Sequence, residues 1–416
     1  MPPSALGPPP RCARAALLIL TLCTLAGAFL LTAAEGAPAR TRSANHARLA
    51  GTSPGFVGVD IDGPLLDPSN SLDLNQQMSS MVSNGVQSVR AAFNWAAAQP
   101  YASWSQVPAD RRSQFVAGPA GRPISYAATD QIVGDAADHG LSVLPTLLYV
   151  PAWDAAGNRS GFKVPQRDAP YAEFAAAMVR RYGTRGSFWS MNPRIPKLPV
   201  SQWQVWNEPN IPAYWPQPFA QRYVALLRLA SRAIRQADPG ARVVLGALTN
   251  LAWHALGRIY AIRGARGLFD SVSVNGFTST PANVILYLRL MRRAMNRYGD
   301  AAKPLIASEL SWPSAIGQTT QHHDFNVTQS GQARNVAELL RLIGSWRGQL
   351  GLSAFYYYTW MGNEFRGAPA FSFSGLLRYT GRGRVQTKPA LAAFRNGALW
   401  LEGCRAKGKT ANRCLH

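Results

Sequence analysis

Short apolar runs alternate with longer amphipathic runs through most of this 416-residue chain, and we count eight of each kind. The short runs are rich in β-branched and aromatic residues, which is typical of buried strands, whereas the longer runs have helical spacing. The predicted strands cover residues 56–60, 86–93, 141–148, 202–206, 242–247, 271–274, 305–308 and 353–358. The predicted helices cover residues 72–84, 126–139, 171–182, 219–237, 256–263, 282–298, 332–346 and 389–399.

Strict alternation of strand and helix favours a parallel sheet, and eight such units favour an α/β fold of the closed (β/α)8 or TIM barrel type, in one domain over residues 55–399. The structural alternative is an open, doubly wound sheet. Such a sheet usually has a glycine-rich phosphate loop after its first strand, but this chain has Asp60-Ile61-Asp62-Gly63-Pro64 there. In a barrel the carboxyl ends of all strands meet on one face, so residues at these ends are the first candidates for a functional site.

The first 39 residues have the pattern of an export segment. Arg11 and Arg14 precede an uncharged run over 15–34, and Ala37-Pro38-Ala39 offers a small-residue cleavage site. The run is about 20 residues long, enough to span a bilayer, so a cleaved signal peptide and an N-terminal membrane anchor both fit the pattern. In either case the rest of the chain, after a linker over 40–54, is expected to be secreted or to lie outside the cytoplasm.

The four cysteines lie near the two ends of the chain: Cys12 and Cys23 in the export segment, Cys404 and Cys414 in a C-terminal tail over 400–416. In an oxidising compartment the tail pair predicts a disulfide, with two free thiols as the alternative. No second pair lies near enough in the sequence to predict a zinc site.

The formal net charge is +22, and almost all of it comes from arginines that are scattered along the chain. Nucleic-acid-binding proteins instead gather their basic residues into a patch or stripe, so no nucleic-acid partner is predicted. Either the composition habit of the source organism or attraction to acidic wall polymers or an anionic membrane accounts for the charge.

Two glutamates stand at predicted strand ends, in a chain that has only seven glutamates. Glu208 follows the fourth predicted strand and Glu309 follows the seventh. Closure of the barrel would bring both side chains to the same face. Two carboxyl groups placed in this way are what cleavage of a glycosidic bond requires, because one donates a proton to the leaving oxygen and the other attacks the sugar.

The motif Trp206-Asn207-Glu208-Pro209 after the fourth strand, with a glutamate at the end of the seventh, resembles the retaining glycoside hydrolases of clan A, especially families 5 and 39. The resemblance spans residues 56–398. It implies Glu208 as acid/base and Glu309 as nucleophile, acting on a carbohydrate substrate in which a β-linked bond is expected. No metal or organic cofactor is predicted, since the two carboxyl groups supply both the proton transfer and the nucleophile.

Side chains around the two glutamates have expected roles. Trp206, Tyr214 and Trp215 could desolvate Glu208 and favour its protonated form. Arg90 lies in an apolar strand and is the expected counter-charge of Glu309, a role that the resemblance also implies. The resemblance further implies that Asn207 binds the 2-hydroxyl of the sugar. Because neighbours on a strand face opposite ways, Asn207 and Glu208 can share a pocket only if the strand end is bent or bulged.

Other strand ends supply candidate sugar contacts. The resemblance implies an aromatic platform at Trp360, for which a core tryptophan is the alternative, while Trp95, Trp153 and Trp312 are weaker candidates. Asn94, Asp60 and Asp62 are expected on the rim, although the two aspartates could instead cap a loop. Phe277 stands where many clan A enzymes have a tyrosine hydroxyl that bonds the nucleophile, and Asn275 could partly replace that contact.

Two further patterns have other interpretations. His322-His323-Asp324 is expected on a polar rim of the cleft, because adjacent histidines point apart and no further ligand spacing supports a metal site. Glu364 is either a substrate contact or a surface residue. Three alternatives to hydrolysis stay open: a noncatalytic glycan-binding barrel at the envelope, a transglycosylase, and a basic envelope scaffold.

Overall fold

The computed structural model describes residues 55–156 and 162–403. The predicted export segment, the linker over 40–54 and the cysteines Cys404 and Cys414 lie outside the described residues. Within the described ranges, no helix is both long enough and apolar enough to cross a membrane.

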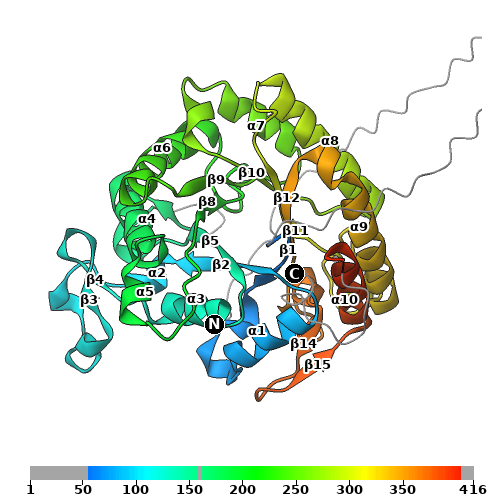
Figure 1. The fold of residues 1–416 in the computed structure, drawn as a ribbon, viewed down its shortest axis with the longest axis horizontal. Coiled ribbons are helices and arrows are strands. Elements are labelled where there is room, and N and C mark those ends of the chain that lie inside the picture. Colours follow the sequence, from blue (N-terminus) through cyan, green and yellow to red (C-terminus); the bar gives the residue numbers. More distant parts are fainter. Residues whose placement is uncertain (1–54, 157–161, 404–416) are drawn as a thin grey trace, which may run out of the picture. The chain divides into compact units, whose positions relative to one another are not determined.

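Eight parallel strands form one sheet with the order β10-β11-β12-β1-β2-β5-β8-β9 (Figure 1). They are β1 (Val57–Ile61), β2 (Ser88–Asn94), β5 (Ser142–Leu148), β8 (Gln202–Asn207), β9 (Arg242–Ala247), β10 (Val272–Asn275), β11 (Leu305–Leu310) and β12 (Leu352–Tyr357). The two edges meet where Val244 pairs with Ser271 and Leu248 pairs with Val274. The (β/α)8 barrel predicted from the sequence is therefore confirmed, with each strand end displaced by at most two residues.

A ring of helices surrounds the sheet (Figure 1). It consists of α1 (Leu74–Ser83), α3 (Ala127–Asp138), α4 (Asp168–Tyr182), α6 (Ala220–Ala237), α7 (Ala252–Tyr260), α8 (Pro281–Arg297), α9 (Gln329–Leu350) and α10 (Pro389–Leu401), with the short α2 (Trp95–Ala98) and α5 (Ser187–Met191) between them. Local chemistry fixes their ends: the Thr280 hydroxyl caps α8 just before Pro281, and Gly351 ends α9 with a φ of 58°.

Smaller sheets are built into the loops at the carboxyl end of the barrel strands. One pairs β3 (Val116–Ala117) with β4 (Pro123–Ile124), and a second pairs β6 (Ala155–Ala156) with β7 (Val164–Pro165). A third joins β13 (Met361–Gly362), β14 (Leu377–Tyr379) and β15 (Val385–Thr387). These additions follow β2, β5 and β12 in the chain, so they shape the face on which the strand ends meet.

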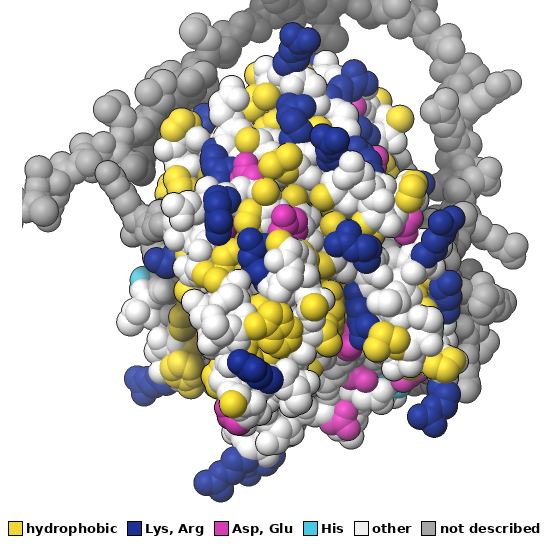
Figure 2. All heavy atoms as spheres, turned by 90° about the vertical axis from the view of Figure 1, so that its left-hand side faces the viewer, with side chains coloured by type: hydrophobic (Ala, Val, Ile, Leu, Met, Phe, Trp, Pro, Cys, Tyr) yellow, Lys and Arg dark blue, Asp and Glu magenta, His cyan; other side chains and the backbone are white. Residues whose placement is uncertain are grey.

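Basic side chains are spread over the barrel exterior. Figure 2 shows one face on which Lys and Arg occur mostly singly among uncharged side chains. This face is consistent with the scattered arginine pattern of the sequence.

Apolar side chains fill the inside of the barrel. Leu144, Val244, Ile306, Ala354 and Tyr356 form a buried cluster that is separate from the larger core between sheet and helices. The Tyr356 ring lies over Gly58 of β1: a Cβ atom at Gly58 would come within 2.4 Å of the ring and 2.7 Å of the Ser88 hydroxyl. The absence of a side chain at position 58 therefore makes room for the tyrosine.

We predict that Gly58→Ala lowers the free energy of unfolding by roughly 1–3 kcal/mol, since the added methyl group overpacks the barrel interior. Gly267→Ala is the matched control, because a Cβ at that exposed position meets nothing within 4 Å. Denaturant titration of both variants measures the difference. Equal stability of the two would contradict the packing described for Tyr356.

Candidate active site

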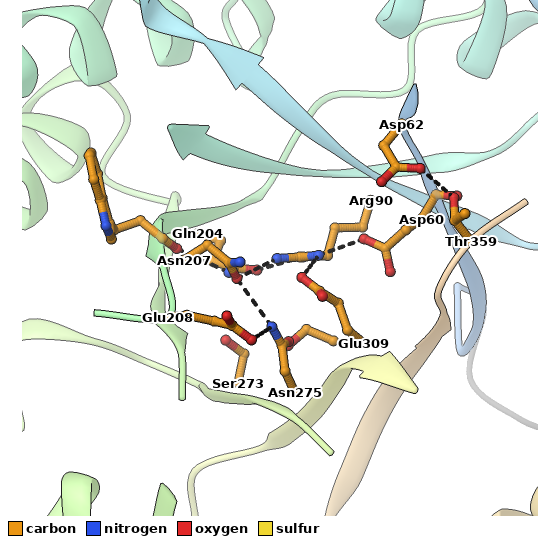
Figure 3. A network of polar contacts seen from close by, with 12 residues as sticks. Asp60, Asp62, Arg90, Gln204, Asn207, Glu208, Ser273, Asn275, Glu309 and Thr359 are labelled. Carbon is orange, nitrogen blue, oxygen red and sulfur yellow. Dashed lines mark hydrogen bonds and ion pairs between the residues drawn. The ribbon is translucent and has the colours of Figure 1, made fainter. Parts of the chain in front are cut away.

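Glu208 and Glu309 reach the same face of the barrel from two strands (Figure 3). Glu309 lies in β11 and Glu208 directly follows β8, and both are at most 9% exposed. The backbone at the end of β8 is irregular, because Trp206 has a φ of 72° and Glu208 a φ of 47°. These left-handed conformations interrupt the alternation of the strand, so Asn207 and Glu208 join one polar network, as the bend expected from the sequence requires.

Aromatic packing holds the irregular turn in place. The Trp206 ring is fully buried, and its centroid lies 5.1 Å from that of Trp215 and 5.9 Å from that of Tyr171. The Glu208 amide donates to the Ala247 carbonyl of β9 at 2.8 Å. Packing of the Trp206 ring therefore anchors the turn that carries Asn207 and Glu208.

Arg90 is the centre of the polar network (Figure 3). Its guanidinium donates to four side chains from three other strands, β1, β8 and β11: Gln204 Oε1 at 3.0 Å, Asp60 Oδ1 at 2.5 Å, Glu309 Oε1 at 2.8 Å and Asn207 Oδ1 at 2.9 Å. Two of these acceptors are carboxylates that share the single nitrogen Nη1. The predicted contact between Arg90 and Glu309 is thus present, and Asp60 is a second partner that the sequence did not indicate.

Asn275 connects the network to Glu208. Its Nδ2 donates to Glu208 Oε1 at 2.8 Å and to Asn207 Oδ1 at 3.4 Å. The Ser308 hydroxyl donates to Asn275 Oδ1 at 2.9 Å, which fixes the amide so that its nitrogen faces the glutamates. Asn275 was expected to contact the nucleophile, and its hydrogen bonding lowers the pKa of both glutamates.

The two glutamates have different electrostatic surroundings. Burial is the main reason why the pKa of Glu208 rises to about 8, and the negative charge of Glu309 adds to it. Burial also raises the pKa of Glu309, but the charge and hydrogen bond of Arg90 oppose the shift. Glu208 has no ion pair with a cation in the described residues. The arrangement therefore favours a protonated Glu208 beside a Glu309 that is held as a carboxylate.

Asp60 is the most unusual of the neighbouring acids. It is 4% exposed, its Oδ2 has no hydrogen-bond partner in the described structure, and burial outweighs Arg90 in raising its pKa well above the usual value. The sequence placed Asp60 among sugar contacts or loop caps, but it is an ion-pair partner of Arg90. Asp62 stays on the rim, where its Oδ1 accepts from the Thr359 hydroxyl at 2.7 Å.

The platform predicted at Trp360 is wrong. This ring is 0% exposed, and its indole nitrogen donates to Gln77 Oε1 at 3.0 Å, so it cannot stack on a sugar. Trp95 and Trp312 are equally buried. Strand β12 ends at Tyr357, and the half-buried ring at the rim is Tyr358, whose hydroxyl interacts with Asp62. The sequence has three consecutive tyrosines, Tyr356 to Tyr358, and strand alternation alone does not show which of them lies at the rim of the site.

Beside Tyr358, an aromatic wall borders the site. Phe277 packs on Phe371 with centroids 4.9 Å apart and on Tyr358 at 6.2 Å, and Phe325 continues the wall. His323 stacks on Phe325 at 4.8 Å, which gives the histidine an aromatic partner in the wall. The described residues contain no group of three or more His, Cys, Asp or Glu side chains that could hold a metal ion.

Two further candidates have structural partners. Asn94 stays near the rim, where its Oδ1 caps α2 by accepting from the Ala97 amide at 3.0 Å. Glu364 is not exposed: it forms a buried ion pair with Lys388 at 2.6 Å. The Lys388 ammonium also donates to the Phe373 carbonyl, so this pair fastens the loop after β12 to the start of α10.

Known structures with the same fold were found, although no family model and no curated protein matches the chain. A family 39 glycoside hydrolase from Bacteroides cellulosilyticus WH2 has a TM-score of 0.57 at 17% identity, over 84% of this chain and 64% of that one. The chain has the fold of clan A glycoside hydrolases. A monomeric beta-xylosidase from Caulobacter crescentus CB15 gives 0.58 at 18% identity, over 83% of this chain and 68% of that one. The catalytic domain of a family 53 glycoside hydrolase from Ignisphaera aggregans has a TM-score of 0.53 at 17% identity, over 82% of this chain and 96% of that one.

These matches confirm the predicted resemblance to clan A at the level of the fold. The chain spans just under two thirds of the Bacteroides protein, so the activity of that whole protein does not pass to this chain by similarity alone.

We predict that Asp60→Asn changes the pH dependence of stability. Burial raises the folded-state pKa of Asp60, so wild type loses stability relative to the variant as the pH rises from about 4 to 7. Thermal unfolding of both proteins across this range measures the gap. A gap that stays constant, or that favours wild type as the pH rises, would mean that Arg90 outweighs burial at this carboxyl group.

Proposed function

We propose that this protein is an exported retaining glycoside hydrolase that cleaves β-linked O-glycosidic bonds by double displacement. The observation that carries the proposal is the buried pair Glu208 and Glu309. Burial raises the pKa of Glu208 and favours its protonated form, whereas an ion pair with Arg90 favours the ionised form of Glu309. The fold shared with clan A glycoside hydrolases supports it. Export rests on the sequence of the first 39 residues.

In the first step, Glu309 attacks the anomeric carbon, and a bond forms between its carboxylate oxygen and that carbon as the glycosidic bond breaks. Glu208 transfers its proton to the departing oxygen. Arg90 holds Glu309 Oε1 at 2.8 Å and so fixes the direction of attack. The raised pKa of Glu208, about 8, keeps the proton available at neutral pH.

In the second step, Glu208 takes a proton from a water molecule, whose oxygen attacks the anomeric carbon and releases Glu309. A sugar hydroxyl in place of water would give transfer instead of hydrolysis. Retention by this route calls for a carboxyl separation of about 5–5.5 Å.

Asn207 is the proposed contact for the sugar 2-hydroxyl. Its Oδ1 is engaged by Arg90 Nη2 at 2.9 Å and approached by Asn275 Nδ2. The amide orientation is thereby set, and the Asn207 Nδ2 group is left to donate to substrate. A contact of this kind strengthens as the sugar ring flattens in the transition state.

We predict that Glu208→Gln and Glu309→Gln each lower kcat/KM on an aryl β-glycoside by at least about a thousandfold, because each removes one of the two reacting groups. Glu338→Gln, on the exposed side of α9, is the control and should keep wild-type activity. A panel of aryl β-glycosides identifies the sugar, and a fluorosugar should leave an ester on Glu309.

Three outcomes would contradict this proposal. An ester on another residue would exclude Glu309 as nucleophile. No turnover on any glycoside, with glycan binding unchanged in both glutamine variants, would identify a noncatalytic glycan-binding barrel. Salt-sensitive adhesion to envelope material that ignores both substitutions would identify a basic scaffold.

The pH profile gives an independent prediction. Glu208 must be protonated to act as the acid, so kcat/KM should fall as the pH rises through about 8. Glu309 must be ionised, so activity should also fall at low pH, at a value above the usual glutamate pKa because burial raises it. Activity that stays constant from pH 7 to 10 would exclude Glu208 as the acid.

A further inference from the structure

A cavity of about 730 Å³ opens beside the catalytic residues, at the carboxyl ends of β1, β2 and β5. Asp62, Asn94 and Tyr149 stand at the catalytic end of its lining. Most of the other lining residues belong to the loop after β1, to α2 and to the start of α3. Burial, and then the negative charges of Asp62 and Glu309, raise the pKa of the Tyr149 hydroxyl. This ring therefore lies where the cavity meets the catalytic carboxyl groups.

The inner lining is apolar. Leu65, Leu74 and Ile132 are buried against it, while Ala127 and Ala128 present an exposed methyl surface on α3. An open cavity of this kind is filled by water that an apolar group would displace favourably. The cavity therefore has the chemistry of a binding site for hydrocarbon.

The charged and aromatic residues in the cavity lining limit which chemical classes of ligand it can bind. All lining residues belong to the described segment 55–156, and none of them is Lys, Arg or His, although the chain has 43 Lys and Arg. Asp62 and Asp67 give the cavity a negative charge, which disfavours a uronate, sulfate or phosphate group. Tyr149 is the only aromatic residue in the lining, so a second sugar would find little surface to stack on.

The position of the cavity relates it to one side of the scissile bond. Glu208 marks the side of the leaving group. The polar network runs from Glu208 through Asn275, Asn207 and Arg90 to Asp60 (Figure 3). Asp62 lies beyond Asp60 on the same strand end, away from Glu208. A sugar over Glu309 and Arg90 would therefore direct its non-leaving side toward Asp62 and the cavity.

We propose that this cavity binds an aliphatic acyl chain carried by the sugar on the non-leaving side of the scissile bond, so that the substrate is an acylated glycoside. The proposal rests on the proposed glycosidase function for its position relative to the bond. Asp62 and Asn94 supply polar contacts at the mouth for the sugar that bears the chain.

Two alanine positions allow a matched test. Ala128 is the second residue of α3 and lines the cavity, whereas Ala282 is the second residue of α8 and does not; both are exposed. Ala128→Trp fills the cavity, and Ala282→Trp places the same ring on another helix of the barrel. Ala127→Trp, also in the lining, takes the place of Ala128→Trp if that variant does not fold.

The kinetic test starts from a 4-nitrophenyl glycoside that the wild-type enzyme hydrolyses. It compares this substrate with the same glycoside bearing an octanoyl ester on its sugar. Wild type should prefer the octanoyl compound by about tenfold in kcat/KM, mainly through KM, since several methylene groups leave water. Ala128→Trp should abolish this preference, and Ala282→Trp should keep it within about twofold of the wild-type value. An equal ratio in wild type and Ala128→Trp would overturn the proposal.

A binding test separates this proposal from the glycosidase proposal. Titration calorimetry with 1-monooctanoylglycerol should show binding to wild type and to Glu309→Gln, and loss of binding in Ala128→Trp. Such binding without turnover of any glycoside would retain the acyl site and reject the glycosidase. Glycoside turnover without octanoyl preference and without this binding would retain the glycosidase and reject the acyl site.

Discussion

The guanidinium of Arg90 is the contact on which the site depends. It is 5% exposed, and it joins side chains of β1, β2, β8 and β11 through four hydrogen bonds. A buried cation without partners would be strongly destabilising, so the barrel must deliver acceptors to it from all sides. The planar fork of arginine meets this demand with several donors in fixed directions, which a lysine could not do. Closure of the sheet and assembly of the site are therefore one structural requirement.

The sequence predicted the barrel well because its signals are local and repeated. Apolar runs such as 202–206 and 305–308 have strand length and strand composition, and both glutamates stand at their ends, where a barrel brings side chains together. Arg90 was predictable for the same reason, since an arginine within an apolar strand needs a buried partner. These inferences need only the strand order and the closed shape, not the details of any loop.

Other parts of the site depend on contacts between distant residues. The left-handed φ of Trp206 depends on packing against Trp215 and Tyr171, and no pattern within the strand shows it. Trp360 was misplaced because the resemblance assigned the platform to this position, whereas β12 ends at Tyr357 and the Trp360 ring is buried against Gln77. Asp60 was assigned to the rim since its pairing with Arg90 depends on the register of β1 against β2, where the two residues are direct neighbours.

The protonation of the site follows from this shared arginine. Asp60, Glu208 and Glu309 are buried around one cation, and burial raises the pKa of all three. A single positive charge balances a single carboxylate, so the neutral arrangement has the lowest free energy in a dry environment. Of these three acids, Asp60 and Glu309 contact Arg90 and Glu208 does not. We infer that Glu208, which has no cation partner among the described residues, holds a proton, while the charge and hydrogen bond of Arg90 favour the ionised form of Glu309. The protonation state of lowest free energy is then also the state that double displacement requires, with a charged nucleophile next to a neutral acid.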